Sequence, residues 1–304
     1  MARLTLESDP LRLELDPARG CCLTGLWIRG PLDADYPILR PAPDQLDSHF
    51  QSACYPLAPW SNRIDRARFD FEGTTHELRP NFEGGHAIHG DVCSRAWAVR
   101  DRTPVSCRCT FDSVAHPDVN YPFPFACVFR ALVTPDSIRL ELSLTNTHDA
   151  PIPAGLGFHP FFMRQLWSTE DVAELAAPVE ARFPLREGVP TGPAASNYTC
   201  TRLGSSAPLL PDLDDCFSGF ESPATIRYPR SGVDLTLKAS RDLDHLVVFT
   251  PTTESGPLPW FCVEPVTIAN DGFNLHARGI PSGTRVLEPG ATLDTTLTIA
   301  VTRH

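Results

Sequence analysis

The sequence predicts an all-β protein in which antiparallel strands form one large domain over residues 1–304. Three observations lead to this prediction. Apolar and polar residues alternate with a period of two in many segments, which is typical of half-buried strands. Few segments carry apolar residues at helical spacing between capping residues. Prolines, 31 in number, and other turn residues recur along the chain, and no linker divides it.

The alternation predicts strands from the first residues to the last. Turns rich in Pro, Gly, Asp and Asn separate them, at residues 146–153, 186–193 and 228–232. The best helical candidate is the short, proline-flanked stretch at residues 168–175, with Ser168 as a possible N-cap. The alternating segments are Leu4/Leu6, Leu11/Leu13/Leu15, Ile138/Leu140/Leu142/Leu144, Val233/Leu235/Leu237 and Leu293/Leu297/Ile299.

Charge and composition exclude several classes of function. The chain has 26 basic and 37 acidic residues, a formal net charge of -11, and no Lys/Arg cluster. A nucleic-acid partner is therefore not expected, because binding the phosphate backbone requires a basic face. No apolar run reaches the roughly 18 residues that a membrane-spanning helix needs. The first residues lack the apolar segment and cleavage site of a secretory signal, which predicts a cytoplasmic protein. A small-molecule partner remains compatible with this composition.

Ten cysteines occur, none of them in a Cys-x-x-Cys pair. This spacing argues against a zinc ribbon and against a redox motif, so we expect reduced and mostly buried thiols. No His-x-x-x-His pair occurs either. The sequence therefore predicts no metal site and no bound cofactor.

Five short segments concentrate polar residues that can take part in chemistry. They are far apart in the sequence, so a common site requires strands and loops from the whole domain to converge on one cleft. The segments are Pro59-Trp60-Ser61-Asn62-Arg63-Ile64, His86-Ala87-Ile88-His89-Gly90, Gly157-Phe158-His159-Pro160-Phe161-Phe162, Leu213-Asp214-Asp215-Cys216-Phe217 and Val263-Glu264-Pro265.

Taken together, the five segments resemble the aldose 1-epimerase (galactose mutarotase-like) family, in the family's order, over roughly residues 10–300. The resemblance implies a large antiparallel β-sandwich. It also implies an isomerase that interconverts the α and β anomers of an aldohexose, such as glucose or galactose, by acid–base opening of the sugar ring. No cofactor or metal is needed for that reaction.

The resemblance assigns catalytic roles to three residues. Glu264 is the base that removes the proton from the anomeric hydroxyl, His159 is the acid that protonates the ring oxygen, and His89 assists His159. Glu264 lies between an apolar run, Phe261-Cys262-Val263, and Pro265, which places this glutamate at the end of an apolar strand. Partial burial there would raise its pKa towards a useful range.

Sugar-binding residues are assigned in the same way. Arg63 and Asp214 match the family's ligands for sugar hydroxyls, and Asn62 mainly shapes the site; Asp215 is expected to be a turn or backbone partner. Trp60 and Trp260 can form an aromatic wall for the apolar face of a pyranose. His86 receives no role.

Two positions depart from the family pattern. Phe161 stands where the family usually has a tyrosine, and Asp91 stands where a second glycine often follows Gly90. The first change removes a hydroxyl near the site, and the second alters the loop after His89.

Other functions compete with this interpretation. A metal-dependent hydrolase or a glycosidase could use the same histidines and carboxylates. The sequence does not show the ligand spacing typical of a metal site, which argues against the hydrolase. A glycosidase needs a pair of carboxylates, and the histidines would then have little function. A hexose-6-phosphate 1-epimerase needs an arginine-rich pocket for the phosphate. The 25 arginines are scattered along the chain, so they neither establish nor exclude such a pocket. A non-catalytic carbohydrate-binding β-sandwich would not require His159 and Glu264.

Overall fold

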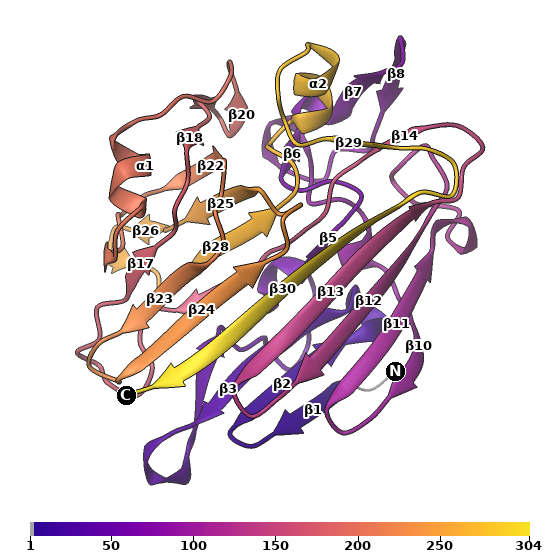
Figure 1. Ribbon diagram of the computed structural model, residues 1–304. Coiled ribbons are helices and arrows are strands. Elements are labelled where there is room, and N and C mark those ends of the chain that lie inside the picture. Colours follow the sequence, from indigo (N-terminus) through magenta and orange to yellow (C-terminus); the bar gives the residue numbers. More distant parts are fainter. Residues whose placement is uncertain (1–2) are drawn as a thin grey trace.

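Two large antiparallel sheets face each other in the computed structural model, which describes residues 3–304 (Figure 1). The first sheet has eleven strands. In spatial order they are β1 (Leu4–Ser8), β2 (Leu11–Asp16), β3 (Cys22–Arg29), β4 (Asp35–Leu39), β16 (Phe161–Met163), β28 (Trp260–Val266), β25 (His245–Phe249), β22 (Asp214–Ser218) and β18 (Ala181–Arg182), while β15 (Gly157–Phe158) joins β28 to β5 (Pro56–Leu57).

The second sheet has nine strands and contains the longest ones in the chain, which Figure 1 shows running side by side across the molecule. Its order is β10 (Ala98–Arg102), β11 (Ser106–Asp112), β12 (Phe125–Val133), β13 (Ser137–Asn146), β30 (Thr292–Arg303), β24 (Val233–Ala239), β23 (Ala224–Tyr228), β17 (Glu174–Ala176) and β21 (Ala207–Pro208).

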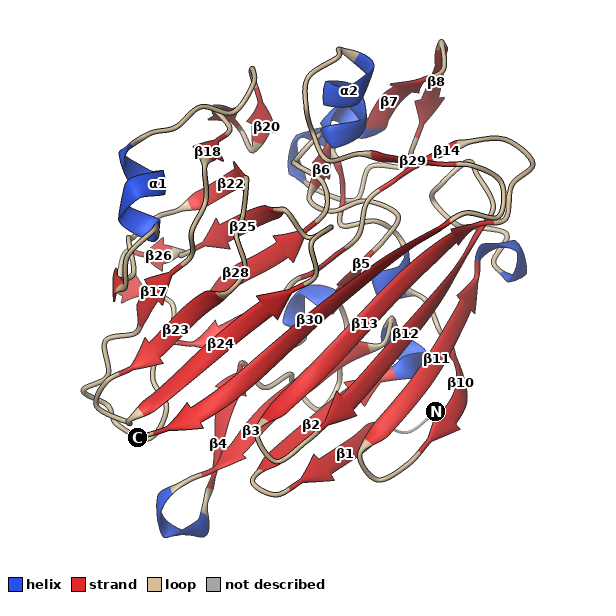
Figure 2. Ribbon diagram, in the orientation of Figure 1, coloured by secondary structure: helices blue, strands red, loops and turns tan. Residues whose placement is uncertain are grey.

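Short elements connect the sheets (Figure 2). The small hairpins and strand pairs are β6 (Arg63–Ile64) with β9 (Ala87–Ile88), β7 (Arg68–Phe71) with β8 (Thr74–Glu77), β14 (Ile152–Ala154) with β29 (Arg285–Leu287), β19 (Leu185–Arg186) with β20 (Val189–Pro190), and β26 (Thr252–Thr253) with β27 (Gly256–Pro257). The α-helices are α1 (Tyr198–Leu203) and α2 (Gly272–Ala277), and the 3-10 helices are η1 (Pro17–Arg19), η2 (Pro31–Asp33), η3 (His49–Gln51), η4 (Asp65–Ala67), η5 (Glu83–Gly85), η6 (Val92–Ser94) and η7 (Ser113–Ala115).

The main core lies between the two sheets. In β12, every second residue from Phe125 to Val133 is buried, and its neighbours are partly or fully exposed. Strands β2 and β13 alternate in the same way. This period of two places one face of each sheet on the core, as the sequence predicted. The all-β antiparallel fold is therefore confirmed.

The first sheet also buries part of its outer face. In β28, Phe261 and Val263 belong to the main core, whereas Cys262 and Val266 belong to a second apolar cluster. Loop residues such as Tyr55 cover this second cluster. Because both faces of β28 are buried, polar side chains on its outer face are enclosed as well.

The helical candidate at residues 168–175 is not helical in the structure. No helix forms there, and residues 174–176 belong to β17. The Asp171 carboxylate is buried and accepts hydrogen bonds from the backbone N–H groups of Arg230 and Ser231, at 2.8 and 3.0 Å. The acidic residue thus fixes a turn of another segment instead of starting a helix.

The ten cysteines are buried and free of disulfides, as expected from their spacing. Among the residues that the structure describes, no helix is long and apolar enough to span a bilayer.

Candidate active site

Glu264 lies inside β28 and not at its end, which corrects the sequence-based placement. The strand continues through Pro265 to Val266. The Glu264 side chain is on the outer face of the sheet with Cys262, and only 2% of the residue is exposed. Apolar neighbours therefore surround a carboxyl group that has almost no access to water.

Strand register brings His159 to Glu264. Gly157 pairs with Val266, and Phe161 pairs with Cys262, in the same antiparallel register. This register places His159 directly opposite Glu264, where side chains on one face of a sheet touch. His159 Nε2 lies 3.3 Å from Glu264 Oε1. Two segments about a hundred residues apart in the chain thus form one carboxyl–imidazole pair.

Burial controls the protonation of this pair. It raises the pKa of Glu264 well above 4.5, with the nearby Asp214 carboxylate as a second cause. Burial lowers the pKa of His159 well below 6.5, and the Arg40 cation adds to this effect. Both shifts favour the neutral forms, so one proton shared between the two side chains is the stable arrangement.

Both side chains keep a polar atom without a partner. Glu264 Oε2 and His159 Nδ1 are buried and make no hydrogen bond within residues 3–304. Buried polar groups are nearly always paired, and exceptions call for an explanation. A bound molecule with hydroxyl groups would supply the missing partners.

Aromatic rings hold the His159 imidazole in place. The Phe161 ring stacks on it with centroids 4.5 Å apart, and the Tyr55 ring lies at 4.6 Å. Phe161 therefore keeps the packing role of a tyrosine at this position without its hydroxyl. Tyr55 has a buried hydroxyl that makes no hydrogen bond in the described part of the chain. Its segment carries no pattern that distinguishes it from an ordinary buried strand, so sequence reasoning missed it.

His89 reaches the same site from a strained turn. Both His89 and Gly90 have left-handed backbone angles, with φ of 66° and 71°. A Cβ atom at Gly90 would lie 2.0 Å from the Ala58 carbonyl oxygen, so only glycine fits. The His89 and His159 ring centroids are 5.0 Å apart. Burial lowers the pKa of His89 well below 6.5, so its ring is neutral.

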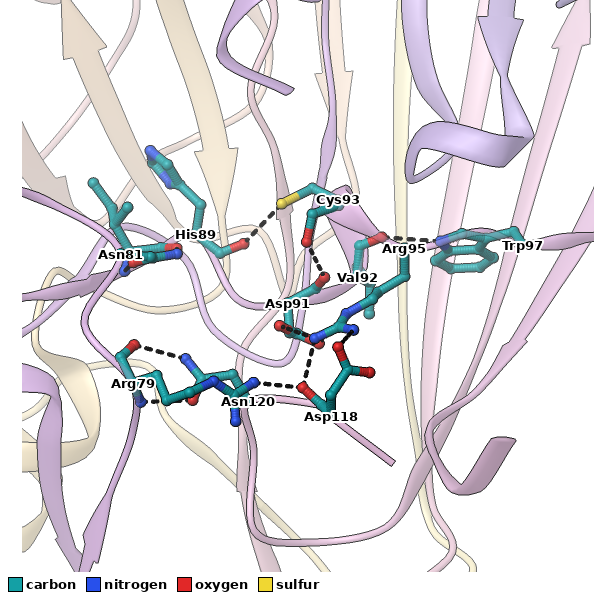
Figure 3. Close-up of polar contacts among 12 residues, drawn as sticks. Arg79, Asn81, His89, Asp91, Val92, Cys93, Arg95, Trp97, Asp118 and Asn120 are labelled. Atoms are coloured by element: carbon teal, nitrogen blue, oxygen red, sulfur yellow. Dashed lines mark hydrogen bonds and ion pairs between the residues drawn. The ribbon is translucent and has the colours of Figure 1, made fainter. Parts of the chain in front are cut away.

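Asp91 stabilises the loop after His89. Figure 3 shows its carboxylate bound by the Arg95 guanidinium, with Arg95 Nε at 2.7 Å and Nη2 at 3.1 Å from the two oxygens. Arg95 also pairs with Asp118 at 2.6 Å, and Cys93 Sγ donates to the His89 carbonyl (Figure 3). The aspartate that replaces a glycine thus ties the histidine loop to a neighbouring segment.

Arg63 and Asn62 line the same pocket as Glu264 and His159. Asn62 has φ of 51°, a left-handed conformation that asparagine tolerates. Its Oδ1 accepts hydrogen bonds from the Arg63 backbone N–H at 2.8 Å and from Arg63 Nη1 at 3.0 Å. Arg63 Nη2 lies 3.5 Å from Asp214 Oδ2. Gly188 packs so closely on this guanidinium that a Cβ atom there would lie 2.4 Å from Arg63 Cζ.

Alternation along β22 decides which aspartate faces the site. Asp214 and Cys216 point to the outer face with Glu264, whereas Asp215 points to the other face. Asp214 lines the pocket, and Asp215 is buried against Arg182 at 2.6 Å. Asp215 is therefore a structural ion-pair partner.

Two other expectations from the sequence are resolved differently. Trp60 is fully buried in the main core and lines no part of the pocket, so of these two tryptophans it is Trp260 that contributes to the aromatic lining. His86 lies outside the pocket and accepts a hydrogen bond from the Arg66 backbone N–H.

These residues enclose a cavity of about 240 Å³. That volume lies below the range typical of drug-sized ligands, roughly 300–1,000 Å³, and suits a single sugar ring. A larger cleft of about 860 Å³ lies between the β7–β8 hairpin and α2, but none of the predicted catalytic residues lines it. The smaller cavity is lined by Arg40, Phe50, Asn62, Arg63, Phe82, Ile88, His89, His159, Phe161, Asp214, Phe249, Trp260 and Glu264.

His159 and Glu264 also form, with the buried Cys262, a group of possible metal ligands. The ligand atoms of His159, Cys262 and Glu264 lie within 4.8 Å of one another. Nitrogen, sulfur and carboxylate oxygen are the donors that Zn²⁺ accepts. A metal ion at this position would have the His159 and Glu264 side chains themselves as ligands.

Fold and site together define a large antiparallel β-sandwich with a small concave pocket, in which a buried carboxyl group and an imidazole lie side by side. The chain belongs to the aldose 1-epimerase family, whose model matches residues 16–300. The resemblance inferred from the five sequence segments is thereby confirmed.

Comparisons with individual proteins agree with this family. The uncharacterized protein YphB of Escherichia coli K12 is 24% identical over 99% of both chains. A galactose mutarotase-like protein from Clostridium acetobutylicum has a TM-score of 0.85 at 16% identity, covering 99% of this chain and 95% of that one. A galactose 1-epimerase from Lactobacillus acidophilus has a TM-score of 0.76 at 16% identity, covering 99% and 94%. At these identities the structures support the fold.

Proposed function

We propose that this protein is an isomerase that interconverts the α and β anomers of an aldohexose by acid–base catalysis. One observation carries the proposal: Glu264 Oε1 and His159 Nε2 lie 3.3 Å apart, buried in a cavity the size of a sugar ring. Family membership gives the reaction type, and the galactose 1-epimerase among the structural relatives suggests an aldohexose as substrate.

In the proposed reaction, the Glu264 carboxylate removes the proton from the C1 hydroxyl while the His159 imidazolium protonates the ring oxygen O5. The C1–O5 bond breaks, and the electron pair of the O1–H bond forms the aldehyde carbonyl. Rotation about C1–C2 presents the other carbonyl face. Ring closure then returns the proton from Glu264 to O1 and the proton from O5 to His159, which yields the other anomer.

The buried site favours ring opening for an electrostatic reason. The reactive form of the pair, a carboxylate with an imidazolium, is the less stable form in this buried site, and both groups are neutral after opening. Burial stabilises neutral forms, as the raised pKa of Glu264 and the lowered pKa of His159 indicate. Proton transfer through the sugar therefore removes two buried charges in one step.

The remaining pocket residues would orient the sugar. Arg63 and Asp214 offer donors and acceptors for hydroxyl groups, and Asn62 holds Arg63 in position. His89 is placed to hydrogen-bond the ring oxygen or a neighbouring hydroxyl. The Trp260 ring provides an apolar surface for one face of the ring.

The direct test is anomer exchange measured by NMR. We expect catalytic amounts of the protein to accelerate exchange between the α and β forms of glucose or galactose, with no effect of EDTA. Loss of activity on chelation would favour a metal enzyme instead. Sugar binding without faster exchange would identify a carbohydrate-binding protein and overturn the proposal.

A bell-shaped pH dependence of kcat/KM is also expected, because the reactive pair carries one proton. Burial favours the neutral forms, so activity rises as His159 loses its proton, at a pKa below 6.5, and falls as Glu264 loses its proton, at a pKa above 4.5. The two limbs report apparent values of the coupled pair. A profile with one limb only would contradict a shared proton.

A further inference from the structure

Arg40 occupies one end of the pocket without an acidic partner. It follows β4, and its backbone N–H donates to the Phe161 carbonyl at 2.8 Å. The guanidinium stacks on two pocket rings, with Cζ 3.8 Å from the Phe161 centroid and 4.8 Å from the Trp260 centroid. No carboxylate within residues 3–304 forms an ion pair with it. Sequence reasoning missed this residue.

The hydrogen bonds of Arg40 leave part of its guanidinium unused. Nη2 donates to the carbonyl oxygens of Phe50 and Ser52, both at 2.6 Å. Nε is buried and has no partner in the described chain. A partly buried cation with spare donors is costly unless an anion or a strong acceptor reaches it.

Arg63, the other arginine of the pocket, differs in this respect. Its charge is matched by Asp214 at 3.5 Å, and Asn62 accepts from it. The pocket thus has one neutralised end at Arg63 and Asp214 and one cationic end at Arg40.

Strand order separates these ends. Leu39 pairs with Phe162, Phe161 with Cys262, Cys262 with Phe249, and Phe249 with Asp214, so Arg40 and Asp214 lie at opposite ends of one cross-strand row. Four strand spacings of about 4.8 Å put their backbones roughly 19 Å apart. A sugar between them meets the Arg40 cation at one end and the Arg63–Asp214 ion pair at the other.

The proposed reaction fixes the direction in which the sugar lies. Tyr55 lies directly beyond His159 on the side away from Glu264. Arg40 lies on that same side, opposite Phe161, whereas Glu264 lies on the other side in β28. If O5 faces His159 and O1 faces Glu264, then C5 and its C6 substituent extend away from β28, towards the side on which Arg40 lies. The group at C6 is therefore the part of the sugar nearest Arg40.

We propose that the pocket selects an aldose with an anionic group at C6, a phosphate or a carboxylate, which the Arg40 guanidinium binds. This inference rests on the proposed function and names the substrate class of the same site. A planar guanidinium with free donors suits both oxyanions, and charge-assisted hydrogen bonds of this kind are about twice as strong as neutral ones.

The test compares glucose, glucose 6-phosphate and glucuronate in the NMR exchange assay. The wild-type protein is expected to act on at least one anionic sugar with a kcat/KM on the order of 10- to 100-fold above that for glucose. The better of the two anions identifies phosphate or carboxylate as the group recognised. Arg40→Gln should abolish the preference, and Arg40→Lys should keep part of it.

Arg164→Gln is the matched control. Arg164 is also a partly buried arginine that donates to a carbonyl oxygen, of Leu258 at 2.7 Å, but it lies outside this pocket. It should leave the preference intact. If Arg40→Gln lowers kcat/KM equally for glucose and for the anionic sugars, the inference is overturned. Arg40 would then serve only to hold residues 48–52 in place through its hydrogen bonds to Phe50 and Ser52. A wild-type preference for glucose would overturn the inference as well.

Binding separates this inference from the proposed function. If no sugar exchanges faster, the proposed function fails, and calorimetry with the same three sugars still measures recognition. Tighter binding of an anionic sugar, lost in Arg40→Gln, would support the role of Arg40. Equal affinities for charged and neutral sugars would contradict it.

Discussion

Glu264→Gln is expected to lower kcat for anomer exchange by about 10²- to 10⁴-fold, the usual contribution of a general base. Glutamine has the same shape as glutamate and can still hydrogen-bond His159 and the sugar, but its amide cannot accept the C1 hydroxyl proton. The NMR exchange rate at saturating sugar measures the loss. The high-pH limb of the activity profile should disappear with it, because that limb reports the Glu264 proton.

Glu141→Gln provides the matched control for this substitution. Glu141 is a strand glutamate of the other sheet, where it pairs with Arg139 at 2.9 Å, far from the pocket lining. This variant should keep full activity. Sugar affinity and melting temperature of Glu264→Gln should stay near those of the wild type. If Glu264→Gln retains more than about a tenth of the wild-type rate, another group is the base.

Alternation made the sheets predictable from sequence. A half-buried strand must place apolar residues at every second position, as in β2 and β13, so its pattern alone identifies it. The pattern of β28 is different, because both faces are buried and the apolar run is continuous apart from Glu264. The sequence therefore places the strand end at Glu264, two residues before the observed end at Val266.

Pairing between distant strands could not be derived from periodicity. Period two fixes the face on which a side chain lies but not the strand that it meets, and the His159–Glu264 contact depends on a register between β28 and the β15–β16 segment. The resemblance to a family supplied this contact, whereas the residue pattern left it open. The structure adds the physical reason, which is direct opposition across two neighbouring strands.

Arg40 and Tyr55 show where sequence reasoning stopped. Neither belongs to a polar segment: Arg40 lines the pocket, whereas Tyr55 packs on the His159 ring from the loop residues that cover the outer face of the first sheet. Trp60 illustrates the opposite error: it lies in a polar segment but is part of the main core. Proximity in sequence to Asn62 and Arg63 did not determine the direction of its side chain.

His159→Asn is the second substitution with a large expected effect, again a loss of about 10²- to 10⁴-fold in kcat. Asparagine can donate a hydrogen bond to O5 but cannot transfer a proton to it, so the leaving ring oxygen would carry negative charge in a buried site. His86→Asn, at a buried histidine outside the pocket, is the control and should remain active. Measuring each melting temperature separates loss of chemistry from loss of folding.

The double variant Glu264→Gln/His159→Asn tests whether the two groups act in one step. Both transfer a proton in the same ring opening, so removing the second after the first should cost far less than its effect alone, as for residues that work as a unit. The geometry already predicts this, because the two side chains lie 3.3 Å apart and face the same pocket. Losses that multiply fully in the double variant would show that Glu264 and His159 act in separate steps, and the concerted proton transfer would have to be abandoned.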